Sequence, residues 1–323
     1  MMMMQSLLRW RTGPRPPKAV TVVRQPLQFA ARRYHRAAPA ADHAGSVLDL
    51  AFERHTPDSF LGDAAEPLPL VVVHGLFGSA QNWRRVARNL ANSLGTTVFA
   101  LDHRNHGSSP FSHGHQHTFH HMSKDVSRFL DTQGIKKCTL VGHSMGGKVA
   151  MTTALLDSRV ARLVVVDSSP VKVQEFRDVR AQLEGMMHVN RSKPASLQEA
   201  DAILRQYVEE KIVRQFLFTN FKPQSETGLY ECRLNLEELH PYIIREVNQF
   251  PIPIDGQAQF EGPTLAVLGS RSHYVPESVR PSLRMLFPNI EYVELDAGHW
   301  VQAERPTEFV DTVCRFVRQH PNV

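Results

Sequence analysis

Short apolar runs alternate with longer amphipathic segments from residue 47 to the end of the chain. The runs are rich in Val, Leu and Ile, which is typical of buried strands. The segments between them carry apolar residues at helical spacing. We predict strands at 47–53, 70–73, 97–101, 139–141, 163–166, 265–268 and 292–295, and helices at 82–95, 122–131, 145–156, 279–287 and 306–318.

This alternation predicts an α/β protein with a mostly parallel central sheet and helices on both faces. A strand that is apolar along its whole length is buried on both sides, and parallel strands are joined by helical crossovers. Residues 171–250 interrupt the pattern, since they offer no clear strand but an amphipathic stretch at 204–216. We interpret them as an inserted helical lid, and 251–253 as the return to the sheet.

Charge divides the chain into a basic leader and an acidic body. The first 41 residues hold eight of the 37 Lys and Arg and no acid, so residues 42–323 keep 29 basic side chains against all 32 acids, a net charge of −3. An Arg-rich, acid-free segment is typical of a mitochondrial transit peptide. We expect residues 1–41 to be such a leader, 42–323 to be the folded domain, and the location to be the mitochondrial matrix. Arg32-Arg33-Tyr34 resembles a matrix-protease cleavage signal. A disordered basic arm that stays attached is the alternative.

Composition excludes several classes of protein. With 42% hydrophobic and 21% charged residues, the chain is globular. It has no run of about 18 apolar residues, so we expect no transmembrane segment. Cys138, Cys232 and Cys314 have no metal spacing, which disfavours both a disulfide framework and a zinc site. The body lacks a nucleic-acid motif and is negatively charged, so we expect no nucleic-acid partner.

The most informative motif is Gly142-His143-Ser144-Met145-Gly146, which lies between a predicted strand and a predicted helix. A nucleophilic serine needs such a tight turn, because the turn lifts its hydroxyl out of the sheet and glycines allow the close packing. Residues 142–148 also match the start of a P-loop, but Val149 stands where Ser or Thr would bind magnesium. Ser144 is therefore the candidate nucleophile, and Lys148 is expected on the helix surface.

A serine nucleophile needs a base that is itself oriented by a carboxylate. His299 follows the last predicted strand, and its place fits the chain order Ser, acid, His. The loop after strand 265–268 reads Gly-Ser-Arg-Ser-His and holds no carboxylate. Asp167, directly after strand 163–166, is therefore the candidate acid, and Asp296 is the reserve.

An acyl-transfer intermediate also requires backbone N–H donors for its oxyanion. Met145, the residue after the nucleophile, can supply one donor. The glycine-containing turn after strand 70–73 can supply the other, from Leu76. Histidines gather at 113–121, but no Cys, Asp or Glu completes a ligand set there, so we expect a solvated loop and neither a metal nor an organic cofactor.

Together these residues resemble the alpha/beta-hydrolase fold family over residues 47–320. More specifically, the sequence resembles the mitochondrial alpha/beta-hydrolase-domain proteins of the eleventh subgroup and the fungal ethanol acetyltransferases. The resemblance implies that the charge-relay acid stands at Asp167. Ser168-Ser169 departs from the single small or apolar residue of the relatives. The residues that carry the resemblance are His74-Gly75-Leu76-Phe77-Gly78-Ser79 with Asn82-Trp83, Asp102 to Pro110, Gly142 to Lys148, and Ala297-Gly298-His299-Trp300.

The resemblance implies acyl-transfer chemistry, because the family includes carboxyl and thioester hydrolases and enzymes that transfer acetyl from acetyl-CoA to ethanol. Both reactions share an acyl-serine intermediate, which water or an alcohol resolves. We expect a serine acyl hydrolase, a carboxylesterase or thioesterase, that acts on a small acyl ester or acyl-CoA and can also pass the acyl group to a short-chain alcohol. The alternatives are an ethanol acetyltransferase and a noncatalytic ligand-binding protein on the same fold.

Overall fold

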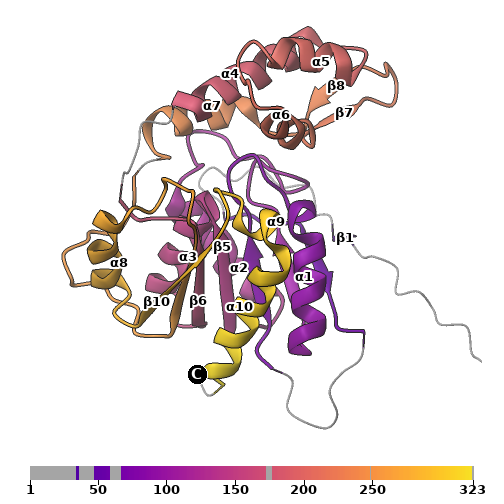
Figure 1. Ribbon diagram of the computed structural model, residues 1–323. Coiled ribbons are helices and arrows are strands. Elements are labelled where there is room, and N and C mark those ends of the chain that lie inside the picture. Colours follow the sequence, from indigo (N-terminus) through magenta and orange to yellow (C-terminus); the bar gives the residue numbers. More distant parts are fainter. Residues whose placement is uncertain (1–33, 36–46, 59–66, 172–176, 248, 322–323) are drawn as a thin grey trace, which may run out of the picture. The chain divides into compact units, whose positions relative to one another are not determined.

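The computed structural model describes residues 34–35, 47–58, 67–171, 177–247 and 249–321. In these ranges the main element is an eight-stranded sheet with the order β1-β2-β4-β3-β5-β6-β9-β10 (Figure 1). In this order, the neighbouring strands from β4 to β10 pair in parallel, whereas β2 pairs antiparallel with both β1 and β4. The prediction of a mostly parallel sheet is therefore confirmed. The strands are β1 (Tyr34–His35), β2 (Phe52–His55), β3 (Leu70–Val73), β4 (Val98–Leu101), β5 (Cys138–His143), β6 (Val160–Val166), β9 (Thr264–Gly269) and β10 (Ile290–Leu295).

Two hydrophobic cores lie on opposite faces of this sheet. Successive side chains of a strand point to opposite faces, so Leu70 and Val72 enter one core while Val71 and Val73 enter the other. Helices cover both faces, as the sequence predicted. The first core includes α1 (Ala80–Leu94), α9 (Val301–Glu304) and α10 (Pro306–Gln319), and the second includes α2 (Phe119–Thr132), α3 (Met145–Leu156), the 3-10 turn η1 (Glu277–Val279) and α8 (Arg280–Leu286).

An inserted segment of helices separates β6 from β9, within the predicted range 171–250. The prediction that this segment contains no strand is wrong, because it also holds a two-stranded antiparallel sheet. Each of these strands has three residues, too few to show an alternation in the sequence. None of the described helices is long and apolar enough to cross a membrane. The elements of the insertion are α4 (Arg177–Ser192), α5 (Leu197–Leu204), α6 (Lys211–Phe218), β7 (Phe221–Pro223), β8 (Tyr230–Cys232) and α7 (Leu236–Arg245).

The sheet edge that holds β1 and β2 differs from the sequence expectation. The predicted strand 47–53 is displaced, since β2 begins only at Phe52. Side chains hold the preceding residues instead: Leu48 N–H donates to Asp125 Oδ1 at 2.7 Å, and Ala51 N–H donates to the Ser109 hydroxyl at 2.9 Å. Within the predicted leader 1–41, β1 pairs with β2. The other leader residues lie outside the described ranges.

Candidate active site

Ser144 lies at the tight turn between β5 and α3, at the carboxyl end of a central strand. Its backbone has φ 53° and ψ −119°, a conformation that is strained for a residue with a side chain. Two glycines make the turn possible. A Cβ atom at Gly142 would lie 2.2 Å from the carbonyl oxygen of Gly146, and one at Gly146 would lie 2.4 Å from that of His74. Strand and helix therefore approach at a distance that only glycine permits.

The structure brings Ser144, His299 and Asp167 together in one line of hydrogen bonds. His299 comes from the loop between β10 and α9, and its Nε2 lies 2.9 Å from Ser144 Oγ. Its Nδ1–H donates to Asp167 Oδ2 at 2.6 Å, and Asp167 follows β6 directly. Because Nδ1 carries the proton that the buried carboxylate accepts, Nε2 is left as the acceptor for the serine hydroxyl. The arrangement can move a proton from Ser144 to His299.

Asp296, the reserve candidate for the acid, is not part of this line. Its carboxylate forms ion pairs with Arg271 and Arg305, and its side chain is 68% exposed. Of these two acids, only Asp167 contacts the His299 ring.

His143, next to the nucleophile, fixes the backbone of the loop that carries His299. Its Nε2–H donates to the His299 carbonyl oxygen at 2.9 Å, and the centroids of the two rings are 4.8 Å apart. Burial lowers the pKa of His143 to about 3, so this imidazole is neutral. His143 thus holds the backbone of His299 in place through this hydrogen bond.

Two backbone N–H groups near the site, those of Leu76 and Met145, have no protein acceptor among the described residues. In the turn after β3, the Phe77 N–H donates to His106 Nε2 at 3.2 Å, and the Phe77 carbonyl accepts from Asn220 Nδ2 at 2.8 Å. Across the described ranges, no acceptor pairs with the N–H of Leu76 or of Met145. Both groups are therefore available to a ligand oxygen.

Sequence reasoning missed two residues that contact the pair Asp167 and His299. Ser272 Oγ–H donates to Asp167 Oδ2 at 2.5 Å, and the Tyr274 ring stacks on the His299 ring with centroids 3.8 Å apart and planes inclined by 13°. Both lie in the loop after β9, where a carboxylate was sought and not found. The absence of a carboxylate from this loop was the one sequence feature that could have indicated a different polar contact here.

No cluster of three or more metal-ligating side chains exists among the residues that the structure describes. The three cysteines are free. Among the histidines at 113–121, His113 and His115 are exposed in the loop and His120 is exposed on α2. His117 is buried, so the expectation of a solvated loop is wrong for this residue: its ring packs against Tyr242 and its Nδ1 lies 3.1 Å from Asn105 Nδ2.

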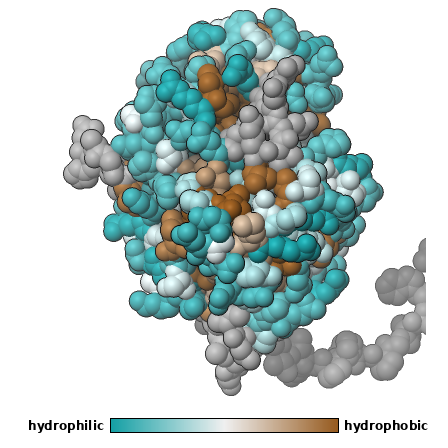
Figure 2. All heavy atoms as spheres, turned by 90° about the vertical axis from the view of Figure 1, so that its left-hand side faces the viewer, coloured by the Kyte–Doolittle hydropathy of each residue, from teal (hydrophilic) through white to brown (hydrophobic). Residues whose placement is uncertain are grey.

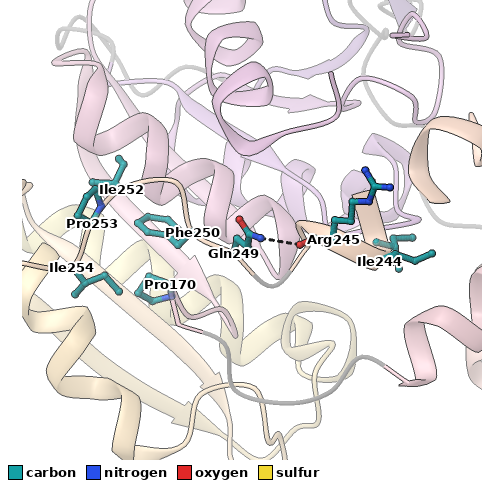
Figure 3. Close-up of a pocket in the computed structure, with 9 residues that line it drawn as sticks. Pro170, Ile244, Arg245, Gln249, Phe250, Ile252, Pro253 and Ile254 are labelled. Atoms are coloured by element: carbon teal, nitrogen blue, oxygen red, sulfur yellow. Dashed lines mark hydrogen bonds between the residues drawn. The ribbon is translucent and has the colours of Figure 1, made fainter. Parts of the chain in front are cut away.

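A pocket of about 510 Å³ lies where the inserted segment returns to the sheet (Figure 3). Pro170, three residues beyond Asp167, forms part of its wall. The face shown in Figure 2 also gathers hydrophobic side chains near its middle. Seven of its nine lining residues have apolar side chains; the lining consists of Pro170, Ile243, Ile244, Arg245, Gln249, Phe250, Ile252, Pro253 and Ile254.

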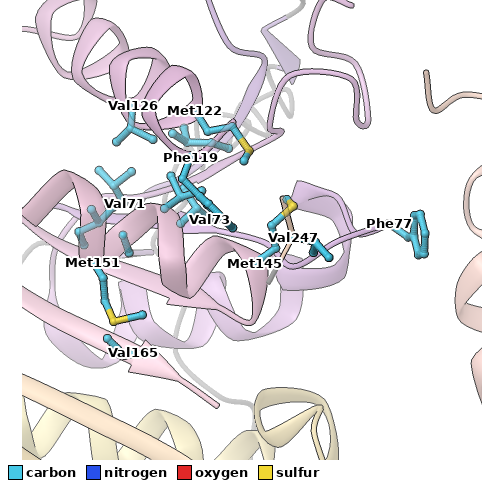
Figure 4. Packing of buried hydrophobic residues seen from close by; sticks show 14 of the residues in the cluster. Val71, Val73, Phe77, Phe119, Met122, Val126, Met145, Met151, Val165 and Val247 are labelled. Atoms are coloured by element: carbon cyan, nitrogen blue, oxygen red, sulfur yellow. The ribbon is translucent and has the colours of Figure 1, made fainter. Parts of the chain in front are cut away.

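Lys148 is buried, so the expectation of a surface residue is wrong. Its ammonium donates to the carbonyl oxygens of Val247 at 3.2 Å and Gln249 at 3.3 Å, and it lies 5.6 Å from the centre of the Phe119 ring. Phe119, Met145 and Val247 belong to the core on this face of the sheet (Figure 4). Burial lowers the pKa of Lys148 to about 8. Lys148 therefore ties α3 to the end of the inserted segment.

Replacing Lys148 by methionine is expected to reduce the free energy of unfolding by about 1–3 kcal/mol, because two buried carbonyl groups lose their donor. Urea unfolding of the full chain measures this change. Lys124→Met is the matched control, since Lys124 is exposed on α2. Equal stability of the two variants would contradict the assigned role of Lys148.

Comparisons with known proteins agree with this geometry. Residues 69–306 match the alpha/beta hydrolase fold family. The chain is 38% identical over 295 residues to the sn-1-specific diacylglycerol lipase ABHD11 of Danio rerio, covering 88% of each chain. It is 33% identical over 307 residues to a probable alcohol acetyltransferase of Saccharomyces cerevisiae, covering 89% of this chain and 88% of the relative.

Among solved structures, a marine microorganism esterase superposes with a TM-score of 0.73 at 27% identity, over 83% of this chain and 99% of its own. The family match spans most of the described chain, and the alignments with the two relatives include 88% of the length of each relative. The chain therefore belongs to the alpha/beta hydrolase family, in the subgroup of ABHD11 proteins and fungal alcohol acetyltransferases that its motifs predicted.

Proposed function

We propose that this protein is a serine acyl hydrolase, a carboxylesterase or thioesterase, with Ser144 as nucleophile, His299 as base and Asp167 as the acid that orients His299. The observation that carries the proposal is the unbroken line from Ser144 Oγ to His299 Nε2 at 2.9 Å and from His299 Nδ1 to Asp167 Oδ2 at 2.6 Å. A binding protein would not need a histidine aligned between a carboxylate and a strained serine.

In the first half of the reaction, Ser144 Oγ attacks the acyl carbonyl while its proton passes to His299 Nε2. The Leu76 and Met145 N–H groups stabilise the oxyanion of the tetrahedral intermediate. When the intermediate collapses, the leaving alcohol or thiol takes the proton from His299, and an acyl-serine ester remains. In the second half, His299 removes a proton from water as the water attacks the acyl-serine ester. When this second tetrahedral intermediate collapses, His299 returns the proton to Ser144 Oγ, and the carboxylic acid is released.

The substrate in this proposal is a small acyl ester or an acyl-CoA. Ester chemistry is supported by the names of the relatives, a diacylglycerol lipase and a probable alcohol acetyltransferase. The second candidate function, acetyl transfer to a short-chain alcohol such as ethanol, is favoured by the yeast relative. It differs only in the deacylation step, where the alcohol replaces water.

The full chain, incubated with an acetyl ester or acetyl-CoA and ethanol, is expected to release acetate, and quantifying acetate and ethyl acetate separates the two functions. Ethyl acetate in large excess over the ethanol-to-water ratio would make the protein an alcohol acetyltransferase. The Ser144→Ala variant is expected to form neither product above background.

A fluorophosphonate probe is expected to modify Ser144 in the folded protein, as peptide mass spectrometry would show. The matched control is Ser225→Ala, because Ser225 is an exposed serine between β7 and β8 and its loss should leave labelling unchanged. A wild-type protein that stays unlabelled would favour the noncatalytic binding function.

Mitochondrial import of the chain is part of the same proposal. It rests on the eight basic and no acidic side chains of residues 1–41. Processing beside Arg33 would retain β1, which pairs with β2. Mass spectrometry of protein isolated from its own cells is expected to find an N-terminus that lies after Met1, at or before residue 42. An intact Met1 would contradict the proposal.

A further inference from the structure

A serine occupies the position beside Asp167 in the loop that follows β9. Ser272 Oγ lies 2.5 Å from Asp167 Oδ2, the same oxygen that accepts the His299 Nδ1–H at 2.6 Å. The Tyr274 N–H donates to Ser272 Oγ at 3.2 Å. Because an ionised carboxylate only accepts hydrogen bonds, the Ser272 hydroxyl is the donor to Asp167.

The loop that carries Ser272 is held firmly in place. Backbone N–H groups of Ser270 and Arg271 donate to the carbonyl oxygens of Leu295 and Ala297, at 2.9 and 3.0 Å. Ser272 N–H donates to the Gly269 carbonyl at 2.9 Å. The loop is thus fixed to the segment that leads from β10 to His299, so its side chains have defined positions.

From this loop, separate contacts reach both Asp167 and His299. Gly269 N–H, at the end of β9, donates to Asp167 Oδ1 at 3.3 Å, so one carboxylate oxygen has a donor from the strand end and the other has one from the loop. The Tyr274 ring covers one face of His299. The carboxylate is therefore held in one orientation, with Oδ2 toward the imidazole.

We propose that Ser272 is a positioning residue of the catalytic site, which orients Asp167 toward His299 and, by sharing the charge of the carboxylate, sets the proton affinity of His299. The inference rests on the proposed function and adds a fourth side chain to its machinery. Ser272 acts through Asp167 and does not touch the reacting atoms.

The two titratable rings that contact the His299 ring, those of His143 and Tyr274, stay uncharged between pH 5 and pH 9. His143 is neutral, since burial lowers its pKa to about 3. The Tyr274 phenol is also neutral, because burial raises its pKa to about 12. The remaining charged or titratable groups near the loop are the exposed His273, Asp178, which acts on Tyr274, and the mutually paired Arg271, Asp296, Glu304 and Arg305.

Removing the Ser272 hydroxyl is expected to change the negative charge on Asp167 Oδ2, the oxygen that contacts His299. In Ser272→Ala, more negative charge stays on Asp167 Oδ2, which favours the imidazolium form of His299. We expect the acid limb of the kcat/KM profile to move to higher pH. We also expect kcat to fall about tenfold, the value of one lost hydrogen bond to a charged group, while KM changes less than twofold.

Rescue by a relocated carboxylate gives the sharper test. In Asp167→Ser, kcat is expected to fall at least about a thousandfold, because His299 loses its orienting acid. Adding Ser272→Asp places a carboxyl carbon near the former Oγ, with oxygens about 1.2 Å further on, toward the space that Asp167 vacates. The double variant is expected to recover at least tenfold over Asp167→Ser.

The experiment measures kcat and KM of the full-length variants from pH 5 to 9, with urea unfolding as a check on folding. Ser272→Thr keeps the hydroxyl and is expected to behave as wild type. Ser270→Ala is the matched control, since Ser270 is exposed in the same loop. If the wild type is active, the Ser272→Ala profile is unchanged and the double variant shows no rescue, the role of Ser272 is overturned while the proposed function stands. A wild type without turnover or labelling would overturn the proposed function and this inference with it.

Discussion

Replacing His299 by alanine is expected to lower kcat/KM for ester or thioester hydrolysis by at least about a thousandfold. His299 Nε2 is the group that contacts the Ser144 hydroxyl at 2.9 Å, so without it the serine proton has no acceptor. Steady-state kinetics of the folded variant measures the loss. His273→Ala serves as the control, because His273 is an exposed histidine in the neighbouring loop.

The same chemistry makes the effects of Ser144 and His299 non-additive. When two residues act as one unit, removing the second adds little to the loss caused by the first. The double variant Ser144→Ala/His299→Ala is therefore expected to be as slow as Ser144→Ala alone. Retention of activity within tenfold of wild type in His299→Ala would refute the assigned base.

Acidification from pH 7 to pH 5 is expected to destabilise the fold by several kcal/mol through its buried histidines. Burial lowers the pKa of His74 to about 4 and those of His106 and His143 to about 3, and it lowers the pKa values of His103 and His117 well below the usual range. The rings of His74, His103, His106 and His117 pack on one another, with the centroids of His74 and His103 4.8 Å apart, whereas the His143 ring packs on His299.

The sign follows from the number of protons bound in each state. Between pH 6.5 and about 4, these histidines are protonated in the unfolded chain but neutral in the folded chain. The unfolded chain therefore binds more protons, so the free energy of unfolding increases with pH in this window and decreases as the pH falls. At pH 5 the loss is about 2 kcal/mol for each of His74, His106 and His143, whose pKa values lie at about 3 to 4, against a typical total stability of about 5–15 kcal/mol.

Urea unfolding at pH 7.5, 6 and 5 tests this expectation. In His143→Gln the slope of stability against pH is expected to decrease by about one proton, or about 1.4 kcal/mol per pH unit. In His113→Gln the slope should stay unchanged, because His113 is exposed. A wild-type stability that is flat from pH 7.5 to 5 would contradict the role given to the buried histidines.

Local sequence determined much of the fold. The strand, turn and helix around Ser144 were predictable because apolar runs, glycines and helical spacing act over a few neighbouring residues, and α3 spans Met145–Leu156 as predicted. Asp167 and His299 could be proposed because the ends of parallel strands meet at one edge of the sheet. The contacts of His299 with Asp167 and with Ser144, at separations of 132 and 155 residues, are a property of the folded chain.

What only the tertiary structure decided depends on partners that the sequence does not mark. Ser272 meets Asp167 across 105 residues, and Lys148 meets Val247 across 99. In the sequence, a serine in a polar loop and a lysine on a helix look like surface residues. Their burial and hydrogen bonds depend on segments that are distant in the sequence, so the local pattern does not show them. The sequence by itself therefore determined the fold class and the candidate chemistry, whereas the folded chain decided which polar groups are buried and which hold the site, since burial and hydrogen bonding arise from long-range packing.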